Sequence, residues 1–313
     1  MRTERWATGG ENLVIQHFGN TGGPVVAVIA GVHGDEPEGP LAAHLIARHL
    51  QSHSLTGQVK LLAVANPAAV RARTRLNPVD GGNLARCFPG DPVGEATPQL
   101  ADTITTRLIA GSDLLVDLHS AGLGLEMPLF VGYQGSQRST VLPAAVSMGL
   151  PLVWEHDNIG PGRSLSAAAD LGVPALYVES AGGGTLLDET VRAYVLALDR
   201  VLQYLAVLPP TAVDAAPAPI FLTGGSGDLD AAVTANHSGR CVLHISAGTT
   251  VKAGQPVATI YDHGSAAQLH QLTAREPGTV MAVRRPTWVQ PGDLVAMLGP
   301  LPTTLPTSSE SRS

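Results

Sequence analysis

The chain has 313 residues, of which 44% are hydrophobic and 14% are charged. This composition excludes a mostly disordered protein and fits one large domain, or a large domain plus a small one. The formal net charge of −7 provides no general positive field, so we expect neither a nucleic acid nor an anionic membrane as a partner. Only two cysteines are present, Cys87 and Cys241, which excludes a disulfide framework and a four-cysteine zinc site.

The sequence carries no sign of export or membrane insertion. No apolar core of a signal peptide follows the first residues, and the longest apolar run, residues 24–32, is too short to span a bilayer. We therefore expect a cytoplasmic protein. A homo-oligomer is compatible with the sequence, but no pattern specifies one.

Short β-branched runs alternate with helix-like segments over residues 1–208, which predicts an α/β domain with a largely parallel sheet. Each run is short and continuously apolar, as buried strands are. The predicted strands are residues 24–31, 59–65, 113–119 and 174–179. Helices are predicted over residues 37–50 and 97–109, where proline near the start is followed by helical apolar spacing.

A second unit is predicted after a linker. Residues 209–219 are rich in proline and alanine, which favours an extended connection. Residues 220–300 lack helix signals and repeat a strand, glycine turn and strand pattern at 251–258 (VKAGQPVA) and 289–296 (VQPGDLVA), so we predict a small all-β sandwich. Residues 301–313 are expected to be a disordered tail.

Three of the predicted strands end in side chains that bind metals or carry protons. His33 and Glu36 follow the first strand, His119 follows the third, and Glu179 ends the last. Ligands gather at the carboxyl edge of an open α/β sheet, and zinc takes imidazole and carboxylate ligands while a catalytic site keeps one position for water. We predict zinc ligation by His33, Glu36 and His119, with Glu179 as the general base.

Several of these side chains also have a simpler structural interpretation. With 11 histidines and 26 acidic residues, an H-x-x-E pair also arises by chance, but the glycines beside His33 allow a tight turn after a rigid strand. His49 and His53, with His44 nearby, are interpreted as a solvated helix face. Cys87 is interpreted as a buried structural thiol, because no histidine is paired with it in the sequence.

Four arginines fall within sixteen positions after the second strand: Arg71, Arg73, Arg75 and Arg86. A guanidinium group pairs with a carboxylate or a developing oxyanion, whereas a solvated loop is the simpler explanation for Arg71 and Arg73. The chain contains no G-x-S-x-G, G-x-x-x-x-G-K-[ST] or G-x-G-x-x-G motif, which removes support for a serine hydrolase, a P-loop enzyme or a dinucleotide enzyme.

Four motifs in this order resemble the succinylglutamate desuccinylase/aspartoacylase family of the zinc carboxypeptidase-like superfamily. They are residues 31–36 (GVHGDE), 83–90 (NLARCFPG), 117–120 (DLHS) and 178–184 (VESAGGG). The resemblance implies a mixed sheet flanked by helices, one Zn²⁺ per chain on His33, Glu36 and His119, and a base at Glu179. It also implies cleavage of the amide bond of a small N-acyl amino acid.

The same resemblance assigns substrate contacts. Arg75 and Arg86 occupy positions that contact the substrate carboxylate and carbonyl in the family, and we include Asn83 among the substrate-binding residues. Ala85 stands where many members have asparagine, which leaves the preferred acyl or amine group open. The C-terminal segment resembles a lipoyl-like sandwich without an attachment turn, so Lys252 is interpreted as a surface residue.

We therefore predict a zinc-dependent amidohydrolase in which Glu179 and Arg86 are catalytic and the partner is a small N-acyl substrate. Two alternatives stay open at this point. One is a metallocarboxypeptidase that acts on peptides, and the other is a non-catalytic homologue that binds zinc or a ligand.

Overall fold

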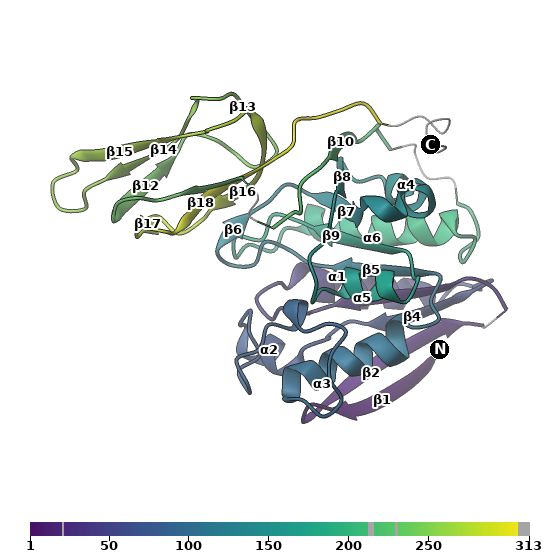
Figure 1. Ribbon diagram of the computed structural model, residues 1–313. Coiled ribbons are helices and arrows are strands. Elements are labelled where there is room, and N and C mark those ends of the chain that lie inside the picture. Colours follow the sequence, from purple (N-terminus) through teal and green to yellow (C-terminus); the bar gives the residue numbers. More distant parts are fainter. Residues whose placement is uncertain (21, 212–215, 229–230, 306–313) are drawn as a thin grey trace.

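A computed structural model of the chain describes residues 1–20, 22–211, 216–228 and 231–305. Its largest element is a nine-stranded mixed sheet in the order β1-β2-β4-β3-β5-β9-β7-β8-β10 (Figure 1). Five of the eight strand pairs are parallel and three are antiparallel, so the predicted largely parallel α/β sheet is confirmed. The strands are β1 (Arg2–Thr8), β2 (Glu11–Gly19), β3 (Val25–Ala30), β4 (Gln58–Leu62), β5 (Leu114–Leu118), β7 (Phe130–Gln134), β8 (Leu152–His156), β9 (Ala175–Glu179) and β10 (Ile220–Thr223).

Helices cover both faces of this sheet. One face packs against α1 (Glu38–Leu50), α4 (Arg138–Ser147) and α6 (Asp188–Tyr204), and the short 3-10 helix η3 (Gly135–Gln137) precedes α4. The other face packs against α3 (Ala96–Thr103), α5 (Ser164–Asp170), the 3-10 helix η1 (Leu84–Arg86) and the π-helical turn η2 (Ile104–Ile109). The short helix α2 (Pro67–Ala72) follows β4.

The predicted central strands correspond to β3, β4, β5 and β9, and the helix predicted over 37–50 is α1. In α1, Ala42, Ile46 and Leu50 repeat every four residues and are buried, which explains why this segment folds as a helix against the sheet. The helix predicted over 97–109 divides into α3 and η2. The β1–β2 hairpin has alternating burial and was not predicted as a pair of strands.

The C-terminal part forms two antiparallel sheets. One contains β11 (Ala231–Thr234), β18 (Leu294–Gly299), β16 (Gly278–Arg284) and β13 (Thr250–Val251), and the other contains β15 (Gln268–Thr273), β14 (Pro256–Tyr261), β12 (Gly239–Leu243) and β17 (Trp288–Val289). A shared apolar core lies between them, as a sandwich requires. Both repeats form the predicted strand, turn and strand, as β13–β14 and β17–β18.

Two observations differ from the predicted division of the chain. Residues 220–223 form β10, which pairs with β8 and extends the large sheet, so they do not belong to the sandwich. Thr303, within the predicted tail, forms a bridge with Phe221. Residues 212–215 of the predicted linker and residues 306–313 of the predicted tail lie outside the described residues.

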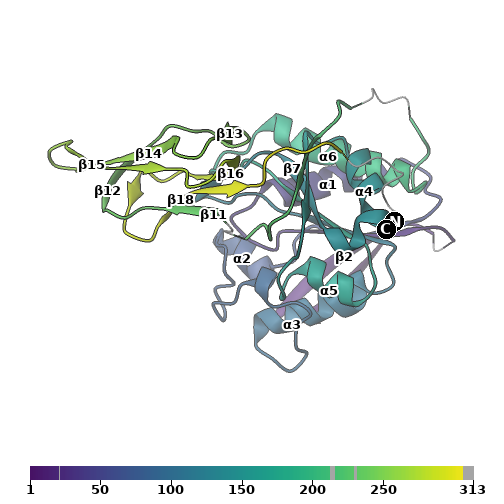
Figure 2. The same cartoon turned by 45° about the horizontal axis from the view of Figure 1, so that its top comes forward.

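The sandwich extends sideways from the large sheet (Figures 1 and 2). The strand β6 (Leu125–Glu126), from the loop after β5, pairs with β16. Next to this junction, Trp154 and Phe130 of the large sheet share an apolar cluster with Met281 and Met297 of the sandwich. The sandwich is therefore held beside the carboxyl end of β5.

None of the helices in the described ranges has the length and apolar content that a membrane-spanning segment requires.

The buried Glu155 of β8 ties the edge of the large sheet together. Its carboxylate accepts hydrogen bonds from Arg138 of α4, from the Tyr133 hydroxyl at 2.7 Å and from the Thr223 hydroxyl of β10 at 3.2 Å. Burial would raise the pKa of this carboxyl, but the hydrogen bonds from Arg138 and Tyr133 outweigh it and hold the pKa below its ordinary value of 4.5.

We expect Glu155→Gln to lower the free energy of unfolding by about 1–3 kcal/mol at pH 7, because hydrogen bonds to a charged group are weakened. A lowered folded pKa means that the stabilisation is complete above about pH 4.5 and disappears as the pH falls through the folded value. The difference in the free energy of unfolding between wild type and variant should therefore become smaller as the pH falls. Urea unfolding from pH 7 to pH 3 measures it, with the exposed Glu276→Gln as control; a difference independent of pH would contradict the charge argument.

Candidate active site

Three neighbouring strands of the large sheet deliver the predicted metal and base residues to one edge. β3, β5 and β9 are adjacent and parallel, so their carboxyl ends lie side by side. His33 and Glu36 lie in the loop after β3, His119 directly follows β5, and Glu179 is the last residue of β9. The predicted convergence of these four residues at one sheet edge is confirmed: all four line a single cavity of about 620 Å³.

Two glycines allow the loop that carries His33. Gly31 has a φ of +66°, which L-residues with side chains rarely adopt. A Cβ atom on Gly34 would lie 1.9 Å from the carbonyl oxygen of Ala69, so this backbone packs directly on α2. α2 is itself fixed in place, because the Asn66 side chain caps it by accepting a hydrogen bond from the Ala69 N–H.

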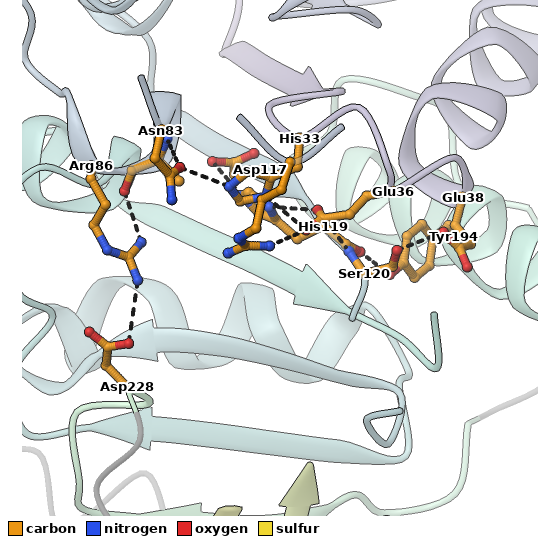
Figure 3. Close-up of polar contacts among 12 residues, drawn as sticks. His33, Glu36, Glu38, Asn83, Arg86, Asp117, His119, Ser120, Tyr194 and Asp228 are labelled. Atoms are coloured by element: carbon orange, nitrogen blue, oxygen red, sulfur yellow. Dashed lines mark hydrogen bonds and ion pairs between the residues drawn. The ribbon is translucent and has the colours of Figure 1, made fainter. Parts of the chain in front are cut away.

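Both histidines face the carboxylate of Glu36 (Figure 3). His33 Nδ1 lies 2.7 Å from Glu36 Oε1, and His119 Nδ1 lies 3.0 Å from Glu36 Oε2. One nitrogen or oxygen atom from each of the three residues lies within 4.8 Å of the other two, and all three side chains are largely buried. Within the described part of the chain, this is the only group of three or more such side chains arranged closely enough to hold a metal ion.

The second nitrogen of each imidazole has its own partner. Asn83 Oδ1 lies 3.0 Å from His33 Nε2 and also accepts a hydrogen bond from the Ala85 N–H, which identifies this amide atom as the oxygen. Asp117 Oδ2 lies 3.2 Å from His119 Nε2 and accepts a hydrogen bond from the Ser164 hydroxyl. Both histidines are thus oriented through Nε2, with Nδ1 directed to Glu36.

This arrangement fits a metal ion. With Nε2 carrying a proton for Asn83 or Asp117, a neutral imidazole has a lone pair on Nδ1, and an ionised carboxylate oxygen only accepts hydrogen bonds. A proton or a metal cation is therefore required between each Nδ1 and Glu36. Two imidazole nitrogens and one carboxylate are a common ligand set of catalytic zinc sites.

Charges inside this cluster are strongly coupled. Burial would raise the pKa of Glu36, but the neighbouring His33 and His119 outweigh burial and hold it far below the usual carboxyl range. Burial would lower the pKa of His119, but the carboxylates of Asp117 and Glu36 raise it well above the usual histidine value. The site thus favours an ionised Glu36 together with positive charge on the histidine side.

Glu179 differs from the other carboxylates of the site. Its Oε2 atom is buried and has no hydrogen-bond partner in the described ranges. Burial first, and then the negative charge of Glu36, raise the pKa of Glu179 to about 8. A carboxyl group with a pKa near neutrality is suited to accept a proton and to return it.

Two further residues, Ser120 and Tyr194, form hydrogen bonds that hold the site in place and were not predicted from the sequence. The Ser120 N–H donates to Glu36 Oε2 at 3.2 Å, and the Ser120 hydroxyl donates to the buried Glu38 at 2.6 Å. The Tyr194 hydroxyl donates to the carbonyl oxygen of His119. The D-x-H spacing of Asp117 and His119 was a usable signal, because residues two apart on a strand point to one side. No local pattern indicated Tyr194, which arrives from α6.

The predicted substrate residues all line the same cavity but have different contacts. Arg75 Nη1 donates to Glu36 Oε1 at 3.0 Å, which places this guanidinium group beside the candidate metal ligands. Arg86 lies farther along the wall, where its Nη2 donates to Asp228 Oδ1 at 3.3 Å. Asn83 contacts His33, so its observed contact is with the candidate ligand; its predicted role in substrate binding stays a prediction.

The side chains that were interpreted from the sequence as structural or solvent-exposed lie outside this cavity. The exposed His49 pairs with Asp199 at 3.1 Å, and the ring of His53 bonds to the carbonyl oxygen of His49. Cys87 is half-buried, and burial raises the pKa of its thiol, which disfavours a reactive thiolate. Lys252 is exposed in the sandwich, as expected.

A sequence model described as "Succinylglutamate desuccinylase/Aspartoacylase catalytic domain" matches residues 22–205, more than half of the chain. The chain belongs to this family. The matched range contains the four motifs and every predicted site residue, whereas the sandwich lies beyond it. The resemblance noted from the sequence is therefore confirmed.

Individual relatives extend the likeness to most of the chain. The chain is 29% identical over 282 residues to N-alpha-acetyl-L-2,4-diaminobutyric acid deacetylase of Halomonas elongata, covering 88% of this chain and 82% of the relative. A succinylglutamate desuccinylase structure from Silicibacter sp. TM1040 superposes with a TM-score of 0.83 at 25% identity, covering 93% and 89% of the two chains. The product-bound structure of the ectoine utilization protein EutE (DoeB) from Ruegeria pomeroyi superposes with a TM-score of 0.83 at 26% identity, covering 93% of this chain and 90% of that chain.

The close backbone contact of Gly34 leads to a prediction about stability. We expect Gly34→Ala to lower the free energy of unfolding by about 1–3 kcal/mol, because the added methyl group must displace either α2 or the His33 loop. Gly22→Ala is the matched control, since a Cβ atom there meets nothing within 4 Å. Denaturant unfolding of both variants compares them, and equal stabilities would contradict the packing seen at Gly34.

Proposed function

We propose that this protein is a zinc-dependent deacylase that hydrolyses the amide bond of a small N-acyl amino acid. The observation that carries the proposal is the convergence of His33, Glu36 and His119, with Glu179, whose Oε2 atom is buried, lining the same cavity. Membership of the family and the deacetylase relative support hydrolysis of an amide. The arrangement of ligands supports the metal.

His33 and His119, through Nδ1, and Glu36, through its carboxylate, are the residues that would hold the ion, with one ion per chain. Bound there, zinc would polarise the acyl carbonyl and lower the pKa of water from about 15.7 to about 7. Asn83 and Asp117 keep the two imidazole rings in the required orientation. Burial of the ligands keeps competing water away from the charged groups.

Glu179 would move the proton in this reaction. Its carboxylate takes a proton from the attacking water as the oxygen–carbon bond forms, and then delivers it to the amide nitrogen as the carbon–nitrogen bond breaks. The products are a carboxylate and a free amine. The raised pKa of Glu179, close to neutrality, allows the same group to serve as base and then as acid.

Arginine side chains would hold the polar ends of the substrate. Arg86 is proposed to stabilise negative charge that develops on the carbonyl oxygen of the substrate. Arg75 and Asn83 add further polar groups to the lining of the same cavity. Met127, Ile159 and Leu165 form part of an apolar lining that suits the hydrocarbon portion of an acyl amino acid.

Removal of the imidazole ligands tests the metal assignment. We expect wild-type protein purified without chelator to contain close to one zinc per chain, and His33→Ala combined with His119→Ala to contain almost none. Elemental analysis measures the content, with the exposed His49→Ala as the control for a histidine outside the site. Full zinc occupancy in the double variant would refute the ligand set.

Glu179→Gln tests the proton transfer separately from the metal. We expect the variant to retain zinc and to lose about 10²- to 10⁴-fold in kcat, because glutamine cannot carry the proton. The exposed Glu189→Gln should behave as wild type. Amine release is followed with acetyl, succinyl and formyl amino acids and with unblocked peptides; turnover of peptides alone would indicate a carboxypeptidase instead.

A further inference from the structure

A carboxylate from outside the family domain lies in the cavity between two arginines. Asp228 follows β10, beyond the residues matched to the catalytic domain, and it lines the same cavity as the candidate metal ligands. Its Oδ1 lies 3.3 Å from Arg86 Nη2, and its Oδ2 lies 2.6 Å from Arg163 Nη2 (Figure 3 shows the Arg86 contact). The catalytic role proposed for Arg86 does not explain this pairing.

The three charged groups are held in place by backbone contacts. The Phe88 N–H donates to the carbonyl oxygen of Gly162, so the loops that carry Arg86 and Arg163 lie against each other. On the opposite side, the Asp157 N–H donates to the Gly225 carbonyl, and the Gly225 N–H donates to the Asp157 carboxylate. The segment before Asp228 is thus attached to the end of β8.

The charges of this group do not balance. Two guanidinium groups share a single carboxylate, and burial together with the nearby Arg163 lowers the pKa of Arg86. One further carboxylate, such as that of the amino acid released by deacylation, would complete the pairing. A second carboxylate on the substrate would lie close to Asp228 without a cation of its own, whereas an ammonium group there would be attracted.

A second carboxylate of the cavity also favours a cationic over an anionic side chain on the substrate. Asp35 lines this cavity, and its Oδ1 atom is buried without a hydrogen-bond partner among the residues that the structure describes. Five carboxylates and three guanidinium groups line the cavity. Zinc bound by His33, Glu36 and His119 would offset the carboxylates at that end, so the selection depends on the local charges around Asp228 after the substrate carboxylate has engaged Arg86 or Arg163.

We propose that Asp228 is a specificity-determining residue that selects N-acyl amino acids with a cationic side chain and rejects those with a second carboxylate. This inference rests on the proposed deacylase function and names its substrate class. Asp228 and Arg86 are each about half exposed, at 46% and 41% of the side chain, so solvent weakens the selection without abolishing it.

Three acetylated amino acids of similar size test the proposal: N-acetyl-2,4-diaminobutyrate, N-acetylasparagine and N-acetylaspartate, which carry a cationic, a neutral and an anionic side chain. We expect wild-type kcat/KM to favour the cationic over the anionic substrate by at least about tenfold at low salt. The ratio should fall as salt is raised to 0.5 M, because screening weakens charge selection but leaves steric fit unchanged.

Asp228→Asn should reduce this ratio to about threefold or less, mainly through a lower KM for N-acetylaspartate, since Arg86 and Arg163 then lack their internal carboxylate. Asp228→Glu keeps the charge and should keep the preference. The exposed Asp170→Asn, at the end of α5 and outside the cavity, is the matched control and should leave the ratio as in wild type.

The outcomes separate this inference from the function on which it rests. If wild-type zinc protein hydrolyses none of the three substrates or any other acyl amino acid, the proposed function fails. If it hydrolyses them without a charge preference, or if the preference is unaffected by both salt and Asp228→Asn, the deacylase function stands and the role of Asp228 is overturned. Should the variants not fold, the charge preference and salt dependence of the wild type decide.

Discussion

The structure depends on one buried carboxylate that is shared by two imidazole rings. Glu36 lies between His33 and His119, and each contact requires a positive charge, from a proton or from a metal ion, between nitrogen and oxygen. Such a cluster costs free energy unless every charge is compensated, because its members are almost fully buried. The adjacent parallel strands β3 and β5 hold the residues in place at a sheet edge, and Asn83 and Asp117 fix the rings from behind.

The groups proposed for proton transfer and substrate binding surround this cluster. Glu179 ends the next strand, β9, and is close enough to be affected by the negative charge of Glu36. Burial and this charge both favour the protonated form of Glu179. Arg75 contacts Glu36 directly, whereas Arg86 lies toward the wall formed after β10. The cavity therefore changes in character from the buried candidate metal ligands to a more exposed charged group, and Arg86 belongs both to the proposed chemistry and to the proposed selection of the substrate.

The sandwich also has a part in the site, although it has an apolar core of its own. β6 pairs with β16, and Leu294 and Met297 of β18 line the cavity together with residues of the large sheet. The Asp228 segment arrives through β10, which is itself a strand of the large sheet.

The α/β class, the central strands, the sandwich and the four residues at the sheet edge could be predicted from the sequence, because these depend on local patterns such as short apolar runs and an H-x-x-E turn. The fold itself was needed to show that β10 extends the large sheet, that Asn83 orients His33, and that Asp228 lies between Arg86 and Arg163. These contacts join residues from separate parts of the chain or depend on which way side chains turn. Local sequence spacing does not indicate such contacts, since they depend on how whole elements pack.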